Sequence, residues 1–199
     1  MKRLAMFVLL SLSLAAPAWV FAQSMENHGE VGVFADYLRF GPSNDTVNFV
    51  GVGGRLGINV HPNFQLEGEM NYDFERNYTY AYSNGITASL VTTGVRPLTG
   101  LFGPKMQAGT SGPIRVFLTG KLGFINFSET PRGVVSGTTF SSSVTGVGGP
   151  GTHLAFYPGG GIEGFIGPVG LRLEVGDEIY LDNGTYNNLR ITFGPHIRF

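Results

Sequence analysis

Charged side chains recur at every second position along several segments of this chain, and such spacing can build an electrostatic device. The clearest segment runs from Phe64 to Arg76, and its polar face carries Gln65, Glu67, Glu69, Asn71, Asp73 and Glu75. A β-strand sends alternate side chains to opposite faces, so these groups share one face. Because carboxylates in a row cannot pack against an apolar core, they need water or counter-charges held in an enclosed lumen.

The counter-charges occur in other segments that alternate in the same way. If the tight turns fix the register of the hairpins, Arg55 falls opposite Glu69, and Glu163 falls opposite Arg172. An unpaired buried charge is strongly destabilising, so the inward groups must pair. We therefore predict a lumen charge network made of Arg55, Glu67, Glu69, Asp73, Lys105, Arg115, Lys121, Glu163, Arg172, Glu174, Glu178, Arg190 and Arg198. It is either a structural salt-bridge network or an electrostatic gate whose changing pairs open a narrow water path.

Alternating strands must position these charges, and the sequence predicts eight of them. The final segment, from Asn188 to Phe199, has one basic or small face and one apolar face made of Leu189, Ile191, Phe193, Pro195, Ile197 and Phe199. The other strands are predicted at residues 30–40, 48–60, 64–76, 98–109, 114–127, 152–165 and 171–181. Asp177 breaks the pattern because it would face lipid, either on a bulge or at the headgroup level.

The connections between the predicted strands alternate between tight turns and longer segments. Tight turns are expected near His61, Thr110 and Gly167, and longer connections at residues 41–47, 77–97, 128–151 and 182–187. Membrane barrels show this asymmetry, with short periplasmic turns and longer outside loops. Residues 77–97 are therefore expected to be a long exposed loop with strand-like extensions, and residues 128–151 an exposed loop.

The start of the chain and its charge balance limit the partners. Residues 1–22 have a basic start, an apolar core and small residues before Gln23, which is typical of a signal peptide cleaved after Ala22. Residues 23–29 would then form a periplasmic tail and residues 30–199 the barrel domain. The mature chain keeps 11 basic and 14 acidic residues, a formal charge of −3. This balance argues against a nucleic-acid partner, which would need a basic patch.

The fold class follows from what the mature part lacks. It has no apolar run near the ~20 residues that a membrane helix requires. Because lipid satisfies no backbone polar groups, a spanning chain without such helices must close into a barrel. The sequence therefore predicts an all-β fold, an eight-stranded antiparallel up-and-down transmembrane β-barrel. The alternative is a soluble lipocalin-type barrel with its apolar faces turned inward. No cysteine and no typical metal-ligand spacing occur, so we expect no cofactor.

With these features the chain resembles the OmpA-like family of small outer-membrane barrels over residues 30–199. The resemblance rests on the signal segment, the eight strands, the alternating turns and loops, and Phe199, and residues 102–105 and 193–196 are similar to strand segments of that family. It implies a place in the bacterial outer membrane, in contact with lipid and lipopolysaccharide. It also implies assembly by the barrel-insertion machinery, through a signal that comprises Phe193, Ile197 and Phe199.

The predicted function is that of an integral outer-membrane barrel with a structural role in the envelope. Its loops at residues 77–97 and 128–151 could bind an extracellular ligand. A narrow gated pore for ions or small solutes is the alternative. Some barrels of this kind modify lipid A with a histidine, a serine and an acid. Here His153 falls near the outer end with Asp182 as its partner, but Ser141 to Ser143 show no triad order, so we do not expect an enzyme.

Overall fold

The computed structural model describes residues 28–40, 47–83, 88–109, 111–131 and 151–199. The predicted signal peptide, its cleavage site after Ala22 and residues 23–27 of the predicted tail lie outside these ranges. Among the described residues, no helix is long and apolar enough to cross a membrane. The strands are β1 (Gly29–Phe40), β2 (Val47–His61), β3 (Phe64–Asp73), β4 (Arg76–Ser83), β5 (Ala88–Ala108), β6 (Ile114–Pro131), β7 (Gly151–Ile166), β8 (Val169–Asp177), β9 (Ile179–Leu181), β10 (Thr185–Tyr186) and β11 (Asn188–Arg198).

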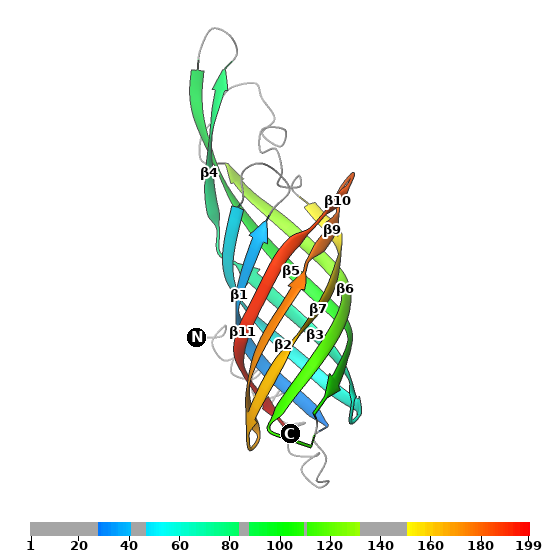
Figure 1. Cartoon of the computed structure of the whole chain (residues 1–199). Helices are drawn as coiled ribbons and strands as arrows, with labels where there is room; N and C mark the ends of the chain where they lie inside the picture. Colours follow the sequence, from blue (N-terminus) through cyan, green and yellow to red (C-terminus); the bar gives the residue numbers. More distant parts are fainter. Residues whose placement is uncertain (1–27, 41–46, 84–87, 110, 132–150) are drawn as a thin grey trace, which may run out of the picture.

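These strands form a closed antiparallel barrel (Figure 1). Around the wall, β1 pairs with β2, β2 with β3, β3 with β5, β5 with β6, β6 with β7, β7 with β8 and β8 with β11, and β1 also pairs with β11, which joins the first strand to the last. β4 continues the line of β3 along β5, β9 continues the line of β8 along β7, and β10 leads into β11, so the wall has eight strands. The predicted eight-stranded transmembrane β-barrel is confirmed.

The two ends of the barrel differ. At one end, named here the tight-turn end, lie the short connections after β2, β5 and β7 together with Phe199. Two of these turns contain glycines with positive φ, Gly109 at 82° and Gly167 at 63°, which other residues rarely adopt. At the opposite end, named here the hairpin end, β4 and the first part of β5 project beyond the barrel wall (Figure 1).

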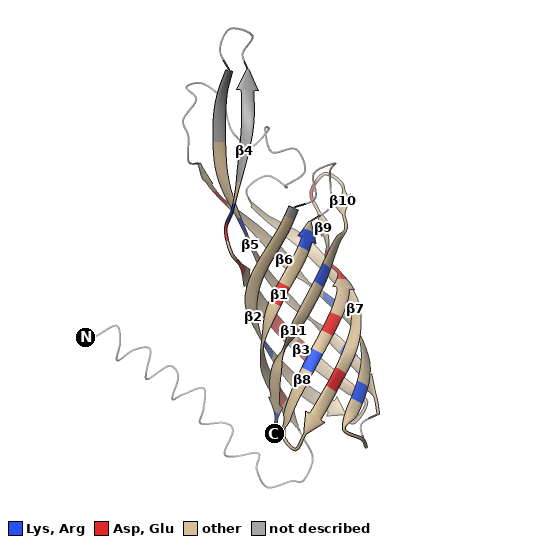
Figure 2. Ribbon diagram, turned by 60° about the vertical axis from the view of Figure 1, so that its left-hand side comes forward, with Lys and Arg blue, Asp and Glu red and all other residues tan. Residues whose placement is uncertain are grey.

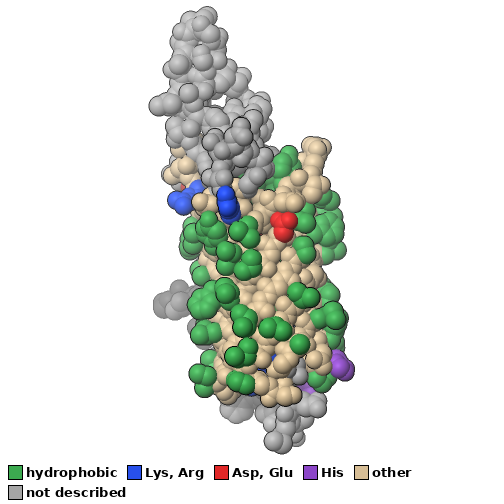
Figure 3. Space-filling view, viewed as in Figure 1, with side chains coloured by type: hydrophobic (Ala, Val, Ile, Leu, Met, Phe, Trp, Pro, Cys, Tyr) green, Lys and Arg blue, Asp and Glu red, His purple; other side chains and the backbone are tan. Residues whose placement is uncertain are grey.

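Side chains alternate between an apolar exterior and a polar interior. On β11, Phe193 is 52% exposed and Ile197 is 49% exposed, whereas Arg190 is fully buried. Hydrophobic side chains are spread over the visible wall of the barrel, where few charged ones appear (Figure 3). Lys, Arg, Asp and Glu recur along the strands (Figure 2), and most of them are buried. The soluble lipocalin-type alternative is wrong, because it would need the apolar faces inside.

One predicted loop is largely a hairpin. Residues 77–97 were expected to form an exposed loop, but β4 pairs with β5 from Arg76↔Val95 to Ser83↔Ala88. β5 therefore begins ten residues before the predicted start at Leu98. The physical reason is the composition of this segment, because β-branched and aromatic side chains suit paired strands even where no core is buried beneath them.

Other connections are also shorter than predicted. β6 continues through residues 128–131, and β7 begins at Gly151, so only residues 132–150 of the second predicted loop remain between strands, and these lie outside the described ranges. The predicted loop 182–187 contains β10, so only residues 182–184 form the turn between β9 and β10. Asn183 in this turn has a φ of 49°. At the other terminus, Gly29 already belongs to β1.

Asp177 lies at the end of β8 and faces outward, half-buried. The register on both sides of it is constant, because Gly159↔Gly176 continues as Phe156↔Ile179 on β7. The pairing therefore contains no inserted residue at this point, which argues against the bulge. Its Oδ1 atom accepts a hydrogen bond from the backbone N–H of Asn188 at 2.8 Å, so the carboxylate has a partner at the hairpin end of the wall.

Candidate functional site

The candidate site is the filled lumen, and its centre is a cluster of carboxylates around one lysine. Lys121 on β6 points into the barrel, and its Nζ lies 2.6 Å from Glu67, 2.7 Å from Glu69 and 3.0 Å from Glu174. Arg172 on β8 lies 2.5 Å from Glu67 and from Glu174. All five side chains are buried, so these are charge-assisted contacts in a site shielded from water.

The network continues toward the hairpin end through two arginines. Arg55 lies 3.1 Å from Glu174 and 3.4 Å from Glu69, its partner across the β2–β3 pair. Arg190 also contacts Glu69, at 2.8 Å, and its Nε donates to Asp36 at 2.9 Å. A longer contact of 3.5 Å joins Arg190 to Glu178.

At the tight-turn end the network continues through Glu163. This residue is paired across the β7–β8 register with Arg172, at 3.3 Å. Its Oε1 atom also accepts a hydrogen bond from Lys105 at 2.7 Å. Lys105 reaches Glu30 at 3.3 Å, and Glu30 reaches Arg115 at 3.5 Å. Shared partners therefore connect the ion pairs into one chain that runs along the lumen.

Two of the sequence-predicted residues lie at the margins of this chain. Asp73 is fully buried and accepts a hydrogen bond from the amide of Asn71 at 3.3 Å. Arg198 is half-buried at the mouth of the tight-turn end, where its Nε donates to the Gly167 carbonyl at 3.2 Å. The other eleven residues of the predicted lumen charge network lie in the ion-pair chain.

The sequence analysis missed two acidic members of the network, Glu30 and Asp36. Both lie on the inward face of β1, where the alternation with Val31 and Val33 could have placed them. With them, eight buried carboxylates face six buried Lys and Arg side chains among the described residues. The lumen therefore has an excess of acid.

Aromatic rings also line the lumen and pack against its cations. Phe34, on the otherwise polar face of β1, lies with its ring centroid 4.5 Å from the Arg55 guanidinium. Phe117 packs against Arg172 at 4.1 Å, and Tyr157 packs against Lys121 at 5.3 Å. A cation over an aromatic face is attracted by the ring quadrupole, so inward aromatic residues are compatible with a charged lumen.

A second aromatic group closes the lumen at the hairpin end. We call it the aromatic plug and define it as Phe40, Phe49, Phe127 and Tyr180, all of which are at most 2% exposed. Ring centroids lie 5.5 Å apart for Phe40 and Phe127, 5.6 Å for Phe40 and Tyr180, and 5.4 Å for Phe127 and Tyr180. Such spacings are typical of favourable aromatic pairs.

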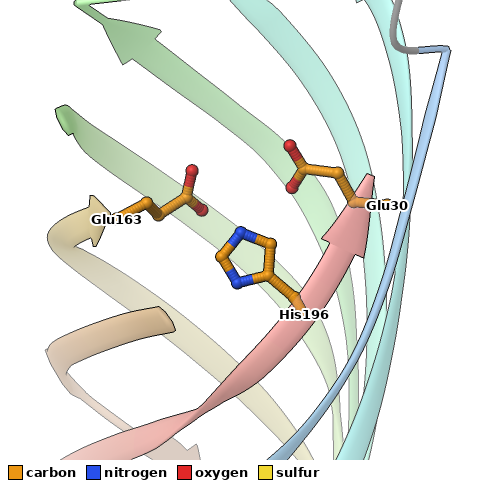
Figure 4. A group of neighbouring side chains, drawn as sticks. All are labelled: Glu30, Glu163 and His196. Atoms are coloured by element: carbon orange, nitrogen blue, oxygen red, sulfur yellow. The ribbon is translucent and has the colours of Figure 1, made fainter. Parts of the chain in front are cut away.

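Within the described part of the chain, two groups of side chains have the composition of a metal site. Glu67, Glu69 and Glu174 lie close together, but the Lys121 ammonium already occupies the space between them. Glu30, Glu163 and His196 form the second group, at the tight-turn end (Figure 4). No local spacing in the sequence could indicate it, because its three members come from β1, β7 and β11.

The predicted histidine–acid pair is present at the hairpin end. His153 Nδ1 lies 3.8 Å from Asp182 Oδ1, and both side chains are partly exposed. Ser141 to Ser143, which would have to supply a nucleophile, lie outside the described residues.

An apolar exterior around a filled, charged lumen defines the class of this protein, a small transmembrane barrel of the outer-membrane type.

No protein-family model and no curated protein matches the sequence. Solved structures do match. Neisserial surface protein A has a TM-score of 0.58 at 12% identity, with 86% of this chain and 97% of that chain covered. The attachment invasion locus protein Ail of Yersinia pestis, solved with the heparin analogue sucrose octasulfate, has a TM-score of 0.52 at 13% identity, with 88% and 100% covered. The outer-membrane enzyme PagL also matches, at a TM-score of 0.34 and 15% identity, with 85% and 99% covered. The chain thus has the fold of small outer-membrane barrels.

Proposed function

We propose that this chain is a closed, non-enzymatic barrel of the bacterial outer membrane, with a structural role in the envelope and an interaction surface at its hairpin end. The observation that carries the proposal is the filled lumen. Fully buried Arg190, Lys105 and Glu163 lie within it, and the aromatic plug lies beyond them. An eight-stranded barrel is only wide enough for its own side chains, so this interior leaves no room for a permanent water path.

The orientation and partners belong to the same proposal. Tight turns of membrane barrels face the periplasm, which puts the projecting β4–β5 hairpin outside the cell. Exposed Arg39 and Arg76 lie near the hairpin end, where guanidinium groups can contact the phosphates of lipopolysaccharide. The barrel-insertion machinery would act on the strand that carries Phe193, Ile197 and Phe199. An extracellular ligand would be held by residues 77–97 and 128–151.

Single-channel recording of the refolded mature chain tests the closed lumen. We expect a silent bilayer for the wild type and for Leu122→Ala, a control in which the changed side chain faces lipid. A variant that removes two rings of the plug, Phe127→Ala with Tyr180→Ala, should also stay silent, because the buried ion-pair chain still fills the rest of the lumen. Folding of each sample is verified by the heat-dependent shift in gel mobility.

The gated pore makes the opposite prediction for the wild type. Discrete openings that Glu69→Gln alters would show that the lumen charges line and gate a water path, and the closed-barrel proposal would be wrong. Glu69 is the suitable residue because it contacts Lys121, Arg190 and Arg55 at once.

The enzymatic alternative is tested on lipopolysaccharide. Vesicles that contain lipopolysaccharide and the folded protein are incubated, and the lipid A is examined by mass spectrometry. We expect no change in mass. If lipid A instead loses or gains an acyl chain, and if His153→Ala abolishes this reaction, the His153–Asp182 pair is part of a catalytic site.

A further inference from the structure

Three metal-ligating side chains from distant parts of the sequence meet inside the tight-turn end. Glu30 comes from β1, Glu163 from β7 and His196 from β11 (Figure 4). The imidazole lies between the two carboxylates, and one ligand atom from each residue lies within 4.8 Å of the other two. The relative exposures are 6%, 0% and 4%, so all three side chains are more than nine-tenths buried.

Three of the candidate ligand atoms take no part in the ion-pair chain, and the fourth has only a long contact in it. Among the described residues, neither ring nitrogen of His196 has a hydrogen-bond partner, and the same is true of Glu163 Oε2 and Glu30 Oε1. Glu30 Oε1 has one longer contact, 3.5 Å from Arg115. Buried polar atoms normally have partners, so a cluster of such atoms from three neighbouring residues is a candidate site for a small ligand.

The wall is shaped around the imidazole. A β-carbon added at Gly170 would fall 2.6 Å from the Cε1 and Nε2 atoms of His196, and one at Gly32 would fall 2.8 Å from its Cβ. The ring also packs edge-on against Phe165, with centroids 4.8 Å apart and an interplanar angle of 90°. Two glycines and an aromatic ring therefore hold the imidazole in one place, as a ligand to a metal requires.

We propose that Glu30, Glu163 and His196 bind a divalent transition-metal ion of the Zn²⁺ class. One imidazole and two carboxylates, with a fourth position open, suit such an ion. Ca²⁺ and Mg²⁺ prefer six or more oxygen ligands, which this group does not supply. Ligands of Zn²⁺ lie at most about 4.2 Å apart, twice the usual bond length of about 2.1 Å, so small side-chain rotations close the site.

Lys105 gives the site an opposing charge. Its ammonium contacts Glu163 Oε1 at 2.7 Å and Glu30 Oε2 at 3.3 Å, so it occupies one oxygen of each carboxylate. An ion would bind the other oxygens, Glu163 Oε2 and Glu30 Oε1, the second of which has only its 3.5 Å contact with Arg115. The ammonium and the ion then share two carboxylates and repel each other. Removing the positive charge of Lys105 is therefore expected to strengthen metal binding, whereas a purely structural role for the group predicts no such gain.

Calorimetric titration of the refolded mature chain with Zn²⁺, and with Mg²⁺ as a comparison, measures the site. We expect one Zn²⁺ per chain and no binding of Mg²⁺. His196→Gln should lower the Zn²⁺ affinity by at least about tenfold, the scale seen when the environment of a metal ligand is altered. The matched control is His61→Gln, because His61 is an exposed histidine at the same end of the barrel. Lys105→Met should raise the affinity.

Two further measurements keep the outcome clear. Co²⁺ should give visible absorption bands with the wild type that are lost in His196→Gln. If that variant does not fold, Gly170→Ala replaces it, because its methyl group would displace the imidazole and weaken binding. No Zn²⁺ binding by the wild type, or equal losses in His61→Gln and His196→Gln, would overturn the proposal. Either result leaves the closed-barrel function untouched, because conductance tests that separately.

Discussion

Replacing Arg190 by Met is the most direct test of the idea that the ion-pair chain holds this barrel together. Arg190 is fully buried and joins three carboxylates, Glu69 at 2.8 Å, Asp36 at 2.9 Å and Glu178 at 3.5 Å. Methionine keeps much of the apolar stem and removes the charge. The change therefore leaves buried carboxylates behind without opening a large cavity.

The expected cost follows from what each carboxylate retains. Glu69 keeps Lys121 and Arg55, whereas among the described residues Arg190 is the cation paired with Asp36 and Glu178. Breaking a buried pair by removing one partner costs about 3–5 kcal/mol, because the remaining charge is uncompensated. We expect Arg190→Met to lower the free energy of unfolding by that amount.

Guanidinium chloride unfolding in lipid vesicles, followed by circular dichroism and gel mobility, provides the measurement. With a slope of about 4 kcal/mol per molar, the expected loss moves the midpoint down by about 1 M. The matched control is Arg39→Met on β1, an exposed arginine near the same end of the barrel. Surface substitutions usually change stability by less than about 0.5 kcal/mol, so its midpoint should hardly move.

A double substitution separates charge from packing. Asp36→Asn in the Arg190→Met background removes one uncompensated carboxylate and should restore part of the lost stability, although Asp36→Asn alone should destabilise the wild type. Equal midpoints for Arg190→Met and Arg39→Met, or simple additivity of the two buried changes, would refute the reasoning.

Two further predictions concern the wall of the barrel. Gly123→Ala should hinder folding, because its methyl group would collide with the Gly100 carbonyl oxygen. Gly120→Ala is the control, because a methyl group there meets open space and the variant should fold normally. The yield of the folded gel band measures folding of both variants, and equal yields would contradict the predicted collision. Leu122→Lys places a charge on the lipid face near the middle of β6 and should make insertion less favourable by about 2–4 kcal/mol, whereas Ile166→Lys beside a tight turn should cost only about 0–1 kcal/mol. Partitioning between vesicles and buffer measures both, and equal effects would contradict a spanning barrel.

The parts of the fold that the sequence predicted are those governed by local alternation. Phe64 to Asp73 alternate so regularly that the face of each side chain follows from its number. The predicted opposition of Arg55 and Glu69 is present, but it depends on more than the tight turn, because the pairing of β2 with β3 shifts by one residue between Asn59 and His61. Contacts across the lumen are different: Lys121 and Glu67 come from strands that do not neighbour each other, so their 2.6 Å contact depends on closure of the barrel.

The extent of β4 and β5 could not be predicted by the same reasoning. Alternation reveals a strand when one face is buried and the other is not, and a hairpin that projects beyond the wall has no such contrast. The mixture of Tyr, Ser, Asn and Thr with β-forming residues in residues 77–97 predicts a long loop with strand-like extensions but not how far the strands extend. Backbone pairing, from Arg76↔Val95 onward, is what makes them strands.

The interior shows why a polar face in a closed barrel need not consist of polar residues. Phe34 and Leu38 interrupt the polar side of β1, yet both point inward: Phe34 lies against Arg55 in the charged region, whereas Leu38 lies in the buried apolar cluster toward the hairpin end. The lumen thus changes along its axis from ion pairs to aromatic and aliphatic packing. Because a narrow barrel must be filled at every level, an inward aromatic residue at the hairpin end closes the lumen without requiring a counter-charge. The same geometry leaves the opposite mouth lined by charged groups and an imidazole, which is where a small cation could enter.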